Sequence, residues 1–427
     1  MLSPVLWRRS ATAIGIYGAT GLGIAGMVVA ARELGKTEFA AFAIVTSASA
    51  FFQLLLDLTV EDALVKFGFR YSTAEDWPRL RRLFDVALRF KLAGGLLAGI
   101  CLLIVAPLSS FVWRPGLTVP LLLVAALPFL QAPENVYGSA IMLRGRYDLR
   151  GYFLLIAMAL RLAGVAIGAH YGVWQAVLGM LAAQVFATAA ITWGGHEALR
   201  RFPRPEAAPL GSHARELRNF VLSSSASSTL VSMRGTLSTL VVGAASPNAT
   251  QAGYFRIAQA PLTAFNALSS PARLVLLTEQ TRDFEQGAHD KMYRMLKRYI
   301  AGTTVLMVVA IPLLWWAMPW LVTTVNGSTF RPAAEPARVL LLGAAIQFIF
   351  GWTKSFPVSI GRPNLRLWPQ IVEIATLVPL TVVFAWRWGA TGAAGAAVIA
   401  SAVFASIWCV LLVRIRRERL DVVAASA

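Results

Sequence analysis

The chain has 427 residues, of which 57% are hydrophobic and only 14% are charged, and its formal net charge is +18. Apolar stretches of about 20 residues recur along its whole length, which excludes a soluble globular protein. The basic residues lie mainly in loops between these stretches. This distribution reports membrane topology, and it indicates contact with anionic lipid headgroups rather than with a nucleic acid.

Twelve apolar stretches are long enough to cross a hydrocarbon layer of roughly 30 Å as helices. The first six are predicted near residues 11–31, 38–60, 84–107, 117–142, 151–169 and 173–193. The second six are predicted near residues 219–243, 253–277, 299–322, 336–358, 366–386 and 390–413. The sequence therefore predicts an all-α, polytopic membrane protein with about twelve transmembrane helices.

The basic residues predict the orientation of these helices. Lys and Arg concentrate at the two termini and in every second loop, whereas the remaining loops contain only five: Arg32, Lys36, Arg114, Arg331 and Arg387. Basic residues stay on the cytoplasmic side of a membrane. Both termini are therefore predicted to be cytoplasmic, and the basic-poor loops, which are short, are predicted to face outward.

The two halves of the chain resemble each other. A shift of 213 residues places TEFAAFAI (37–44) over TQAGYFRI (250–257), and similar matches recur at nearly the same offset. Six helices per copy make the copies parallel, with an axis along the membrane normal. Residues 1–200 and 219–427 are therefore predicted to form two six-helix lobes, joined by a cytoplasmic connector at 201–218 that is rich in proline and arginine.

Two predicted helices carry polar stripes. The helix at 253–277 has polar residues at spacings of three and four, which places them on one face: Arg256, Gln259, Thr263, Asn266, Ser270 and Arg273. The helix at 38–60 has a corresponding stripe of Thr46, Gln53 and Asp57, continued by Glu61. At the 213-residue shift the two stripes occupy equivalent places, the first acidic and the second basic.

Arg161 and Arg234 lie near the middle of predicted helices. A charge at a helix centre costs about 2.5 to 3.5 kcal/mol, so it persists only where it faces water, a ligand or a partner. The alternative to a ligand is an intramembrane pair with Glu134, Glu373 or Asp57.

Other cationic and polar residues also have structural interpretations. Arg256, Arg273 and Lys354 lie near helix ends, where they could extend to the membrane surface. Ser224, Ser227 and Ser228 form a serine face on the same helix as Arg234, and such faces also serve close helix packing.

Scans for other sites give negative expectations. The histidines, His170, His196, His213 and His289, have no metal-ligand spacing, so neither a metal nor a catalytic site is predicted. Gly21, Gly23 and Gly26 match a nucleotide-binding spacing but lie inside an apolar span, which predicts a helix-packing surface instead.

Two segments carry a family resemblance. AARELGKTEFAAFAIVTSASAFFQLLLDLTVEDALVKFG (30–68) resembles the first and second helices of polysaccharide-lipid flippases, which belong to the multidrug, oligosaccharidyl-lipid and polysaccharide exporter superfamily. AGYFRIAQAPLTAFNALSSPARLVLL (252–277) resembles their eighth helix. The resemblance implies two six-helix bundles in a bacterial inner membrane around a central cavity. Helices 1, 2, 7 and 8 would line this cavity, which opens alternately to either side.

The resemblance implies that the protein flips a polyprenyl-diphosphate-linked oligosaccharide, such as an O-antigen, capsule or exopolysaccharide repeat unit. The expected substrate-binding residues are Arg234, Arg256, Arg273, Asn266, Thr263, Gln53, Arg161 and Lys354, and the acids expected to couple or pair are Asp57, Glu61, Glu134 and Glu373. Helix 7 of related sequences often carries an aspartate before its glycine, but this chain has STLVVG at 238–243. A mechanism that needs that acid is therefore not supported here.

Several alternatives stay open. A drug or cation antiporter of the same fold would need an acidic site, whereas the eighth helix is basic. A membrane glycan polymerase or ligase would need a sizeable outer loop, and a scaffold that transports nothing is not excluded. Coupling to protons, to sodium or to the membrane potential is undecided, and no cofactor is expected. A polymerase and glycosyltransferases of the same pathway are the expected protein partners.

Overall fold

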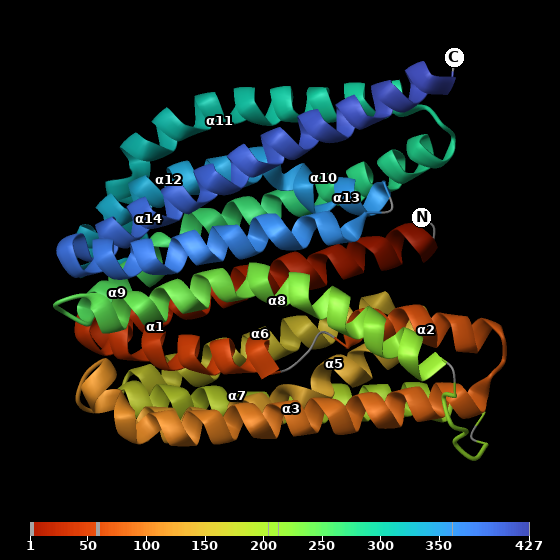
Figure 1. Ribbon diagram of the computed structural model, residues 1–427. Coiled ribbons are helices and arrows are strands. Elements are labelled where there is room, and N and C mark those ends of the chain that lie inside the picture. The colour runs from red at the N-terminus through yellow and green to blue at the C-terminus, as the bar shows by residue number, and fades with distance from the viewer. Residues whose placement is uncertain (1–3, 57–59, 204, 212, 361, 427) are drawn as a thin grey trace. The chain divides into compact units, whose positions relative to one another are not determined.

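The computed structural model describes residues 4–56, 60–203, 205–211, 213–360 and 362–426. This part of the chain consists almost entirely of helices and contains no strand (Figure 1). The helices form two compact units, Met1–Ala244 and Ala245–Ala427. The seventh predicted helix packs with the first unit, and the division into lobes at 1–200 and 219–427 stays a prediction.

The first unit contains eight helices within the described residues. They are α1 (Pro4–Leu56), α2 (Glu61–Thr73), α3 (Trp77–Val112), α4 (Thr118–Val124), α5 (Leu127–Leu143), α6 (Tyr147–Ala169), α7 (Val173–Arg200) and α8 (His213–Ala245).

The second unit contains long helices and short 3-10 turns. They are α9 (Thr250–Ala258), α10 (Ala260–Glu285), α11 (His289–Asn326), η1 (Ser328–Ala333), α12 (Ala334–Ile349), η2 (Phe350–Lys354), α13 (Phe356–Ser359), η3 (Pro363–Arg366) and α14 (Leu367–Ser426).

Eight apolar stretches of the described residues are long enough to cross a membrane. Two of these stretches, in α1 and α14, each contain two predicted spans. Gly35 (φ 66°, ψ 178°) separates the two spans of α1 and Gly389 (φ 59°, ψ −139°) those of α14, each at a predicted outer turn. Other residues rarely adopt such positive φ angles. The seventh predicted span lies in α8, and the more polar eighth lies in α9 and α10. The predicted all-α, polytopic fold with about twelve membrane-crossing helices is confirmed.

The eighth predicted helix is not continuous. It is interrupted at Gln259, between α9 and α10, two residues before Pro261. Proline has no backbone N–H to donate, and its ring clashes with the preceding turn of a helix. The polar stripe predicted on one straight helix is therefore divided between two helical segments.

Glycines bring α6 and α7 into direct backbone contact. A Cβ atom added to Gly179 would lie 2.0 Å from the carbonyl oxygen of Gly164, and one added to Gly168 would lie 2.2 Å from that of Gln175. Small residues allow such close approach of helices in membranes. By contrast, no described atom lies within 4 Å of a Cβ added to Gly21 or Gly23. The prediction that these two glycines form a packing surface is wrong.

The connector after α7 contacts the end of the first unit that carries the α2–α3 and α5–α6 turns. The Phe202 ring packs on Trp77 with centroids 5.6 Å apart, and the Arg144 guanidinium lies 5.0 Å from the same ring. Arg81 Nη1 donates a hydrogen bond of 3.0 Å to the carbonyl oxygen of Pro205. The connector therefore packs against the start of α3 before α8 begins.

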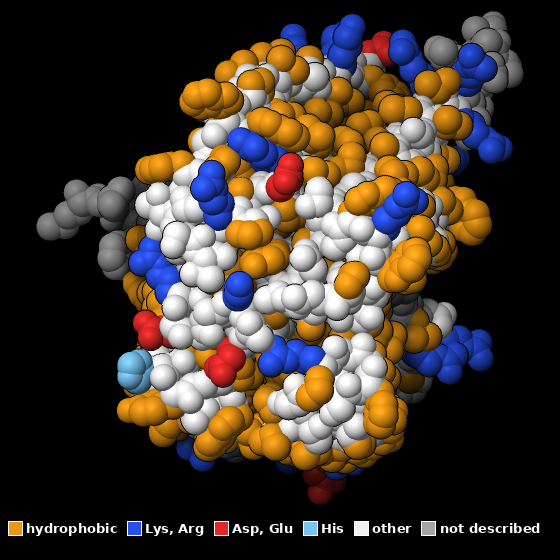
Figure 2. Space-filling view, turned by 90° about the vertical axis from the view of Figure 1, so that its left-hand side faces the viewer, with side chains coloured by type: hydrophobic (Ala, Val, Ile, Leu, Met, Phe, Trp, Pro, Cys, Tyr) orange, Lys and Arg blue, Asp and Glu red, His pale blue; other side chains and the backbone are white. Residues whose placement is uncertain are grey.

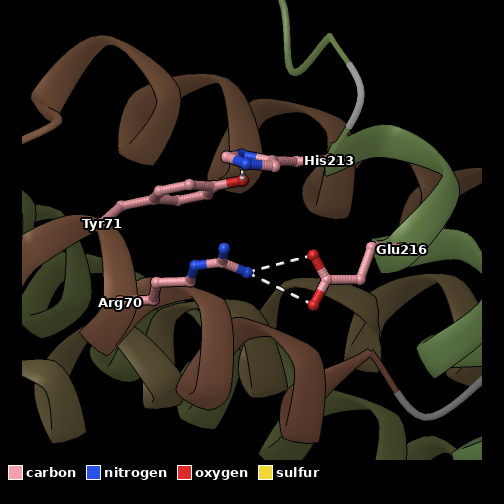
Figure 3. Close-up of polar contacts among 4 residues, drawn as sticks. All are labelled: Arg70, Tyr71, His213 and Glu216. Atoms are coloured by element: carbon pink, nitrogen blue, oxygen red, sulfur yellow. Dashed lines mark hydrogen bonds and ion pairs between the residues drawn. The ribbon is translucent and has the colours of Figure 1, made fainter.

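Polar contacts join the first residues of α8 to the last residues of α2 (Figure 3). Arg70 forms a salt bridge of 3.0 Å with Glu216, and the Tyr71 hydroxyl shares a hydrogen bond of 3.2 Å with His213 Nδ1. Burial raises the pKa of the Tyr71 phenol above its ordinary value, so the hydroxyl keeps its proton at neutral pH. These contacts join the start of α8 to α2 of the first unit.

Large hydrophobic side chains are exposed on the surface of the predicted membrane-spanning helices. Phe111, Trp193 and Trp316 are 90%, 74% and 85% exposed. Exposed apolar surface on this scale is expected where hydrocarbon replaces water as the solvent. Figure 2 instead views the helix ends, where hydrophobic side chains are mixed with backbone, polar and charged groups.

Candidate functional site

The predicted binding residues of the second unit lie on α9, α10 and η2. Lys354 Nζ on η2 donates a hydrogen bond of 3.3 Å to Asn266 Oδ1 on α10. Arg256 Nη1 donates one of 3.1 Å to Gln259 Oε1, across the junction of α9 and α10. Lys354 is thus directed toward a neighbouring helix, whereas a side chain that extends to the membrane surface would point away from it.

Thr263 and Asn266 follow Gln259 on the same side of the chain, one turn apart. The Thr263 hydroxyl is exposed and donates to the Gln259 carbonyl oxygen at 3.3 Å. Asn266 is half-buried. The second unit therefore brings two predicted residues, Asn266 and Lys354, into contact, and a third, Thr263, lies one turn before Asn266 on α10.

Glu373 is buried beside an amide. It is 6% exposed, and Gln347 Nε2 on α12 donates a hydrogen bond of 3.0 Å to its carboxylate. This contact joins α12 to α14. The acid predicted to couple or pair thus has a partner that holds two helices of the second unit together.

The first unit has its own buried polar network, between α5 and α7. Gln131 Nε2 donates to Gln184 Oε1 at 2.9 Å, and Gln184 Nε2 donates to the Glu134 carboxylate at 3.0 Å and to Thr188 Oγ1 at 2.9 Å. The Thr188 hydroxyl donates in turn to the Leu130 carbonyl oxygen. Each amide in this chain of hydrogen bonds orients the next.

Arg161 reaches the same region from α6. Its Nη2 lies 3.0 Å from Met180 Sδ on α7, and its guanidinium interacts electrostatically with the Glu134 carboxylate. Arg150, also on α6, interacts with Glu134 as well. Arg161 thus lies within electrostatic range of Glu134, one of the acids that the sequence offered as its partner, and an ion pair between the two stays a prediction.

Glu61, one of the acids expected to couple or pair, forms an ion pair with a partner that the sequence did not predict. Its carboxylate lies 3.0 Å from Lys91 Nζ, and the two side chains are 16% and 2% exposed. Lys91 lies on α3, inside the span predicted at 84–107. The two apolar helical turns that follow Lys91 in the sequence could have indicated that its side chain is buried.

Arg234 is only 8% exposed and lies within the apolar part of α8, Thr229–Ala245. Gln53 is half-buried on α1, three residues before the described part of this helix ends. Asp57, together with the side chains of Arg273, Ser224, Ser227 and Ser228, lies outside the described residues. Nothing in the structure therefore bears on the positions predicted for these five side chains.

The chemistry of these groups suits a hydroxylated anion. Guanidinium and ammonium groups form charge-assisted hydrogen bonds with phosphate oxygens, and amides and hydroxyls can exchange hydrogen bonds with sugar hydroxyls. Among the described residues, no three His, Cys, Asp or Glu side chains group as metal ligands would.

Comparison with known proteins assigns this architecture to a family. The family described as "Polysaccharide biosynthesis protein" matches residues 29–335. No curated protein matches the sequence.

Solved structures share the fold. The lipid II flippase MurJ in an inward closed conformation has a TM-score of 0.76 at 12% identity, covering 95% of this chain and 87% of its own. An inward-facing multidrug resistance MATE transporter of the MOP superfamily has a TM-score of 0.73 at 15% identity, covering 97% and 98%. A MOP superfamily transporter from Pyrococcus furiosus has a TM-score of 0.62 at 15% identity, covering 96% and 94%. The chain therefore belongs to the polysaccharide biosynthesis protein family and has the fold of MOP superfamily flippases and transporters.

Proposed function

We propose that this protein flips a polyprenyl-diphosphate-linked oligosaccharide across a bacterial inner membrane by alternating access. The observation that supports this proposal most is the family match over residues 29–335, because a membrane protein of transporter fold can serve polysaccharide biosynthesis by moving its intermediates. Both termini are cytoplasmic in this proposal, so the glycan moves from the cytoplasmic to the outer leaflet.

The headgroup is the physical obstacle to this movement. A diphosphate with its sugars loses hydration in hydrocarbon and gains no replacement for it. In the proposed mechanism, Arg234, Arg256 and Arg273 receive the diphosphate, since arginine suits bidentate contact with phosphate oxygens. Gln53, Thr263, Asn266 and Lys354 bond the sugar hydroxyls, and the polyprenyl tail stays in the lipid.

We assign a different role to the charged residues of the first unit's interior. The Gln184–Glu134 hydrogen bond and the Lys91–Glu61 ion pair each join neighbouring helices of that unit, and Arg161 interacts electrostatically with Glu134. In this assignment they maintain the shape of the unit while it moves as a body, and the glycan contacts other residues.

Reconstitution tests the proposed function against its rivals. Proteoliposomes that contain the full chain are expected to transfer a fluorescent polyprenyl-diphosphate oligosaccharide between leaflets faster than protein-free vesicles. The measurement is the fraction of label that an added quencher reaches with time. Equal rates with and without protein would refute the proposal. Exchange of a cationic drug without glycan transfer would favour the antiporter, and a lengthened glycan would favour the polymerase.

A further inference from the structure

The second unit has a hollow of about 490 Å³ between the start of α11 and the end of α14. Both of these helix ends lie at the end of the unit that carries the α10–α11 turn (Figure 1). The residues that line the hollow come from these two helices alone: Asp290, Tyr293, Arg294, Leu296, Lys297, Ile300, Leu412, Val413 and Arg416.

The lining combines cations with an apolar wall. Arg294, Lys297 and Arg416 are exposed and supply three positive charges, against one negative charge from Asp290. Arg294 and Lys297 are three residues apart, so they lie on neighbouring positions of one face of α11. Ile300 continues this face toward the membrane interior, opposite Leu412 and Val413 on α14.

This distribution matches the chemistry of one kind of lipid. A phospholipid presents a phosphate at the membrane surface and acyl chains directly beneath it, in the same order as the cations and the apolar wall of the hollow. Arginine contacts phosphate through two parallel N–H groups, and lysine contacts it as a point charge. Basic side chains beside a membrane surface each attract anionic lipid by about 1 kcal/mol.

We propose that this hollow is a binding site for the headgroup of an anionic phospholipid of the leaflet in which α11 begins and α14 ends. The net positive lining selects an anionic headgroup over a zwitterionic one. A bound lipid would contact both helices at the surface of the hydrophobic cluster to which Met292 and Leu296 of α11 and Trp408 and Ile415 of α14 belong. This site goes beyond glycan flipping, and it requires no contact with the glycan.

The chain offers a matched pair of variants for the test. Arg294→Gln/Arg416→Gln removes one cation of the hollow from each helix. Arg298→Gln/Arg417→Gln removes one exposed arginine from each of the same helices, and neither of these residues lines the hollow. Both variants lose the same net charge, so a general electrostatic effect on membrane affinity changes both equally.

The experiment titrates phosphatidylglycerol into the detergent-solubilised full chain and counts bound lipids by native mass spectrometry, with phosphatidylcholine as the second lipid. Removing two cations from the hollow is expected to weaken the binding of phosphatidylglycerol about 30-fold, from about 1 kcal/mol for each hydrogen-bonded contact with the headgroup that is lost. The control variant is expected to bind as the wild type does, and phosphatidylcholine is expected to bind weakly to all three proteins.

Three outcomes would overturn this proposal. The first is that both variants weaken the binding of phosphatidylglycerol equally, and the second is that phosphatidylglycerol and phosphatidylcholine bind equally well. The third is that a polyprenyl phosphate displaces phosphatidylglycerol when it is present at a lower concentration than phosphatidylglycerol, which would identify the hollow as a carrier-lipid site. The thermal unfolding midpoint in phosphatidylcholine verifies that the exposed substitutions leave the fold intact. No glycan is present, so failure here leaves the flipping result unaffected.

Discussion

Replacing Gly179 with alanine is expected to lower the free energy of unfolding by about 3 kcal/mol, at the upper end of the usual cost of overpacking. The added Cβ would lie 2.0 Å from the Gly164 carbonyl oxygen and 3.2 Å from its Cα. Because both partners are backbone atoms, no side-chain rotation can relieve the clash, and α6 and α7 must separate. Unfolding followed by circular dichroism in detergent measures the effect.

Gly21→Ala is the matched control for this substitution. Gly21 is also helical and in the same unit, but no described atom lies within 4 Å of its added Cβ. Alanine is a better helix former than glycine by about 1 kcal/mol, so this variant is expected to be as stable as the wild type or slightly more stable. If Gly179→Ala were equally well tolerated, the close contact between α6 and α7 would be refuted.

Replacing Lys91 with methionine is expected to cost about 3 kcal/mol of stability. Removal of one partner of a buried ion pair leaves an uncompensated charge, at a typical cost of about 3 to 5 kcal/mol. The lower end applies because Glu61 keeps 16% of its surface exposed and also interacts electrostatically with Arg150. The double variant Lys91→Met/Glu61→Gln removes both charges and is expected to recover most of the loss.

An exposed ion pair of the same unit provides the comparison. Arg70 and Glu216 are each 49% exposed, and their salt bridge has the same 3.0 Å length as that of Lys91 and Glu61. Exposed pairs contribute only about 0.2 to 1 kcal/mol, so Arg70→Met is expected to change the stability by less than about 1 kcal/mol. The interpretation fails if Lys91→Met costs no more than Arg70→Met, or if Glu61→Gln does not rescue it.

The transmembrane helices could be predicted because their signal is local. About 20 successive apolar residues are needed to cross the membrane, whatever the rest of the chain does. The interruptions at Gly35 and Gly389 were also predictable as loops, since each glycine lies within two residues of a basic side chain, Lys36 or Arg387, between two apolar stretches. Helix length was less predictable, because helices continue beyond the hydrocarbon layer, as α3 does by starting at Trp77.

The helix interruption before Pro261 shows where local signals fail. Prolines also occur inside helices that continue without interruption: Pro107, Pro133, Pro312, Pro319 and Pro379. Neighbouring helices decide whether the freed backbone groups are satisfied. A proline in the sequence therefore marks a place where a helix can be interrupted, and tertiary contacts determine whether it is.

The candidate site was predictable by residue type and less so by role. Spacing alone placed Asn266 and Thr263 on one side of the eighth span, but it could not identify Lys354 as the partner of Asn266, 88 residues away. It likewise could not distinguish Arg161, which interacts with Glu134, from an arginine that meets a ligand. Such pairings depend on which helices pack together, and hydropathy contains no information about that.

The most direct test of the proposed mechanism is the flipping rate of Arg234→Ala in proteoliposomes supplied with labelled polyprenyl-diphosphate oligosaccharide. Arg234 is the buried cation of α8, at 8% exposure. If it receives the diphosphate, the alanine variant flips far more slowly than the wild type. Arg234→Lys should recover part of the rate, since lysine keeps the charge and lacks the bidentate fork. An alanine variant that flips the glycan at the wild-type rate would contradict the account.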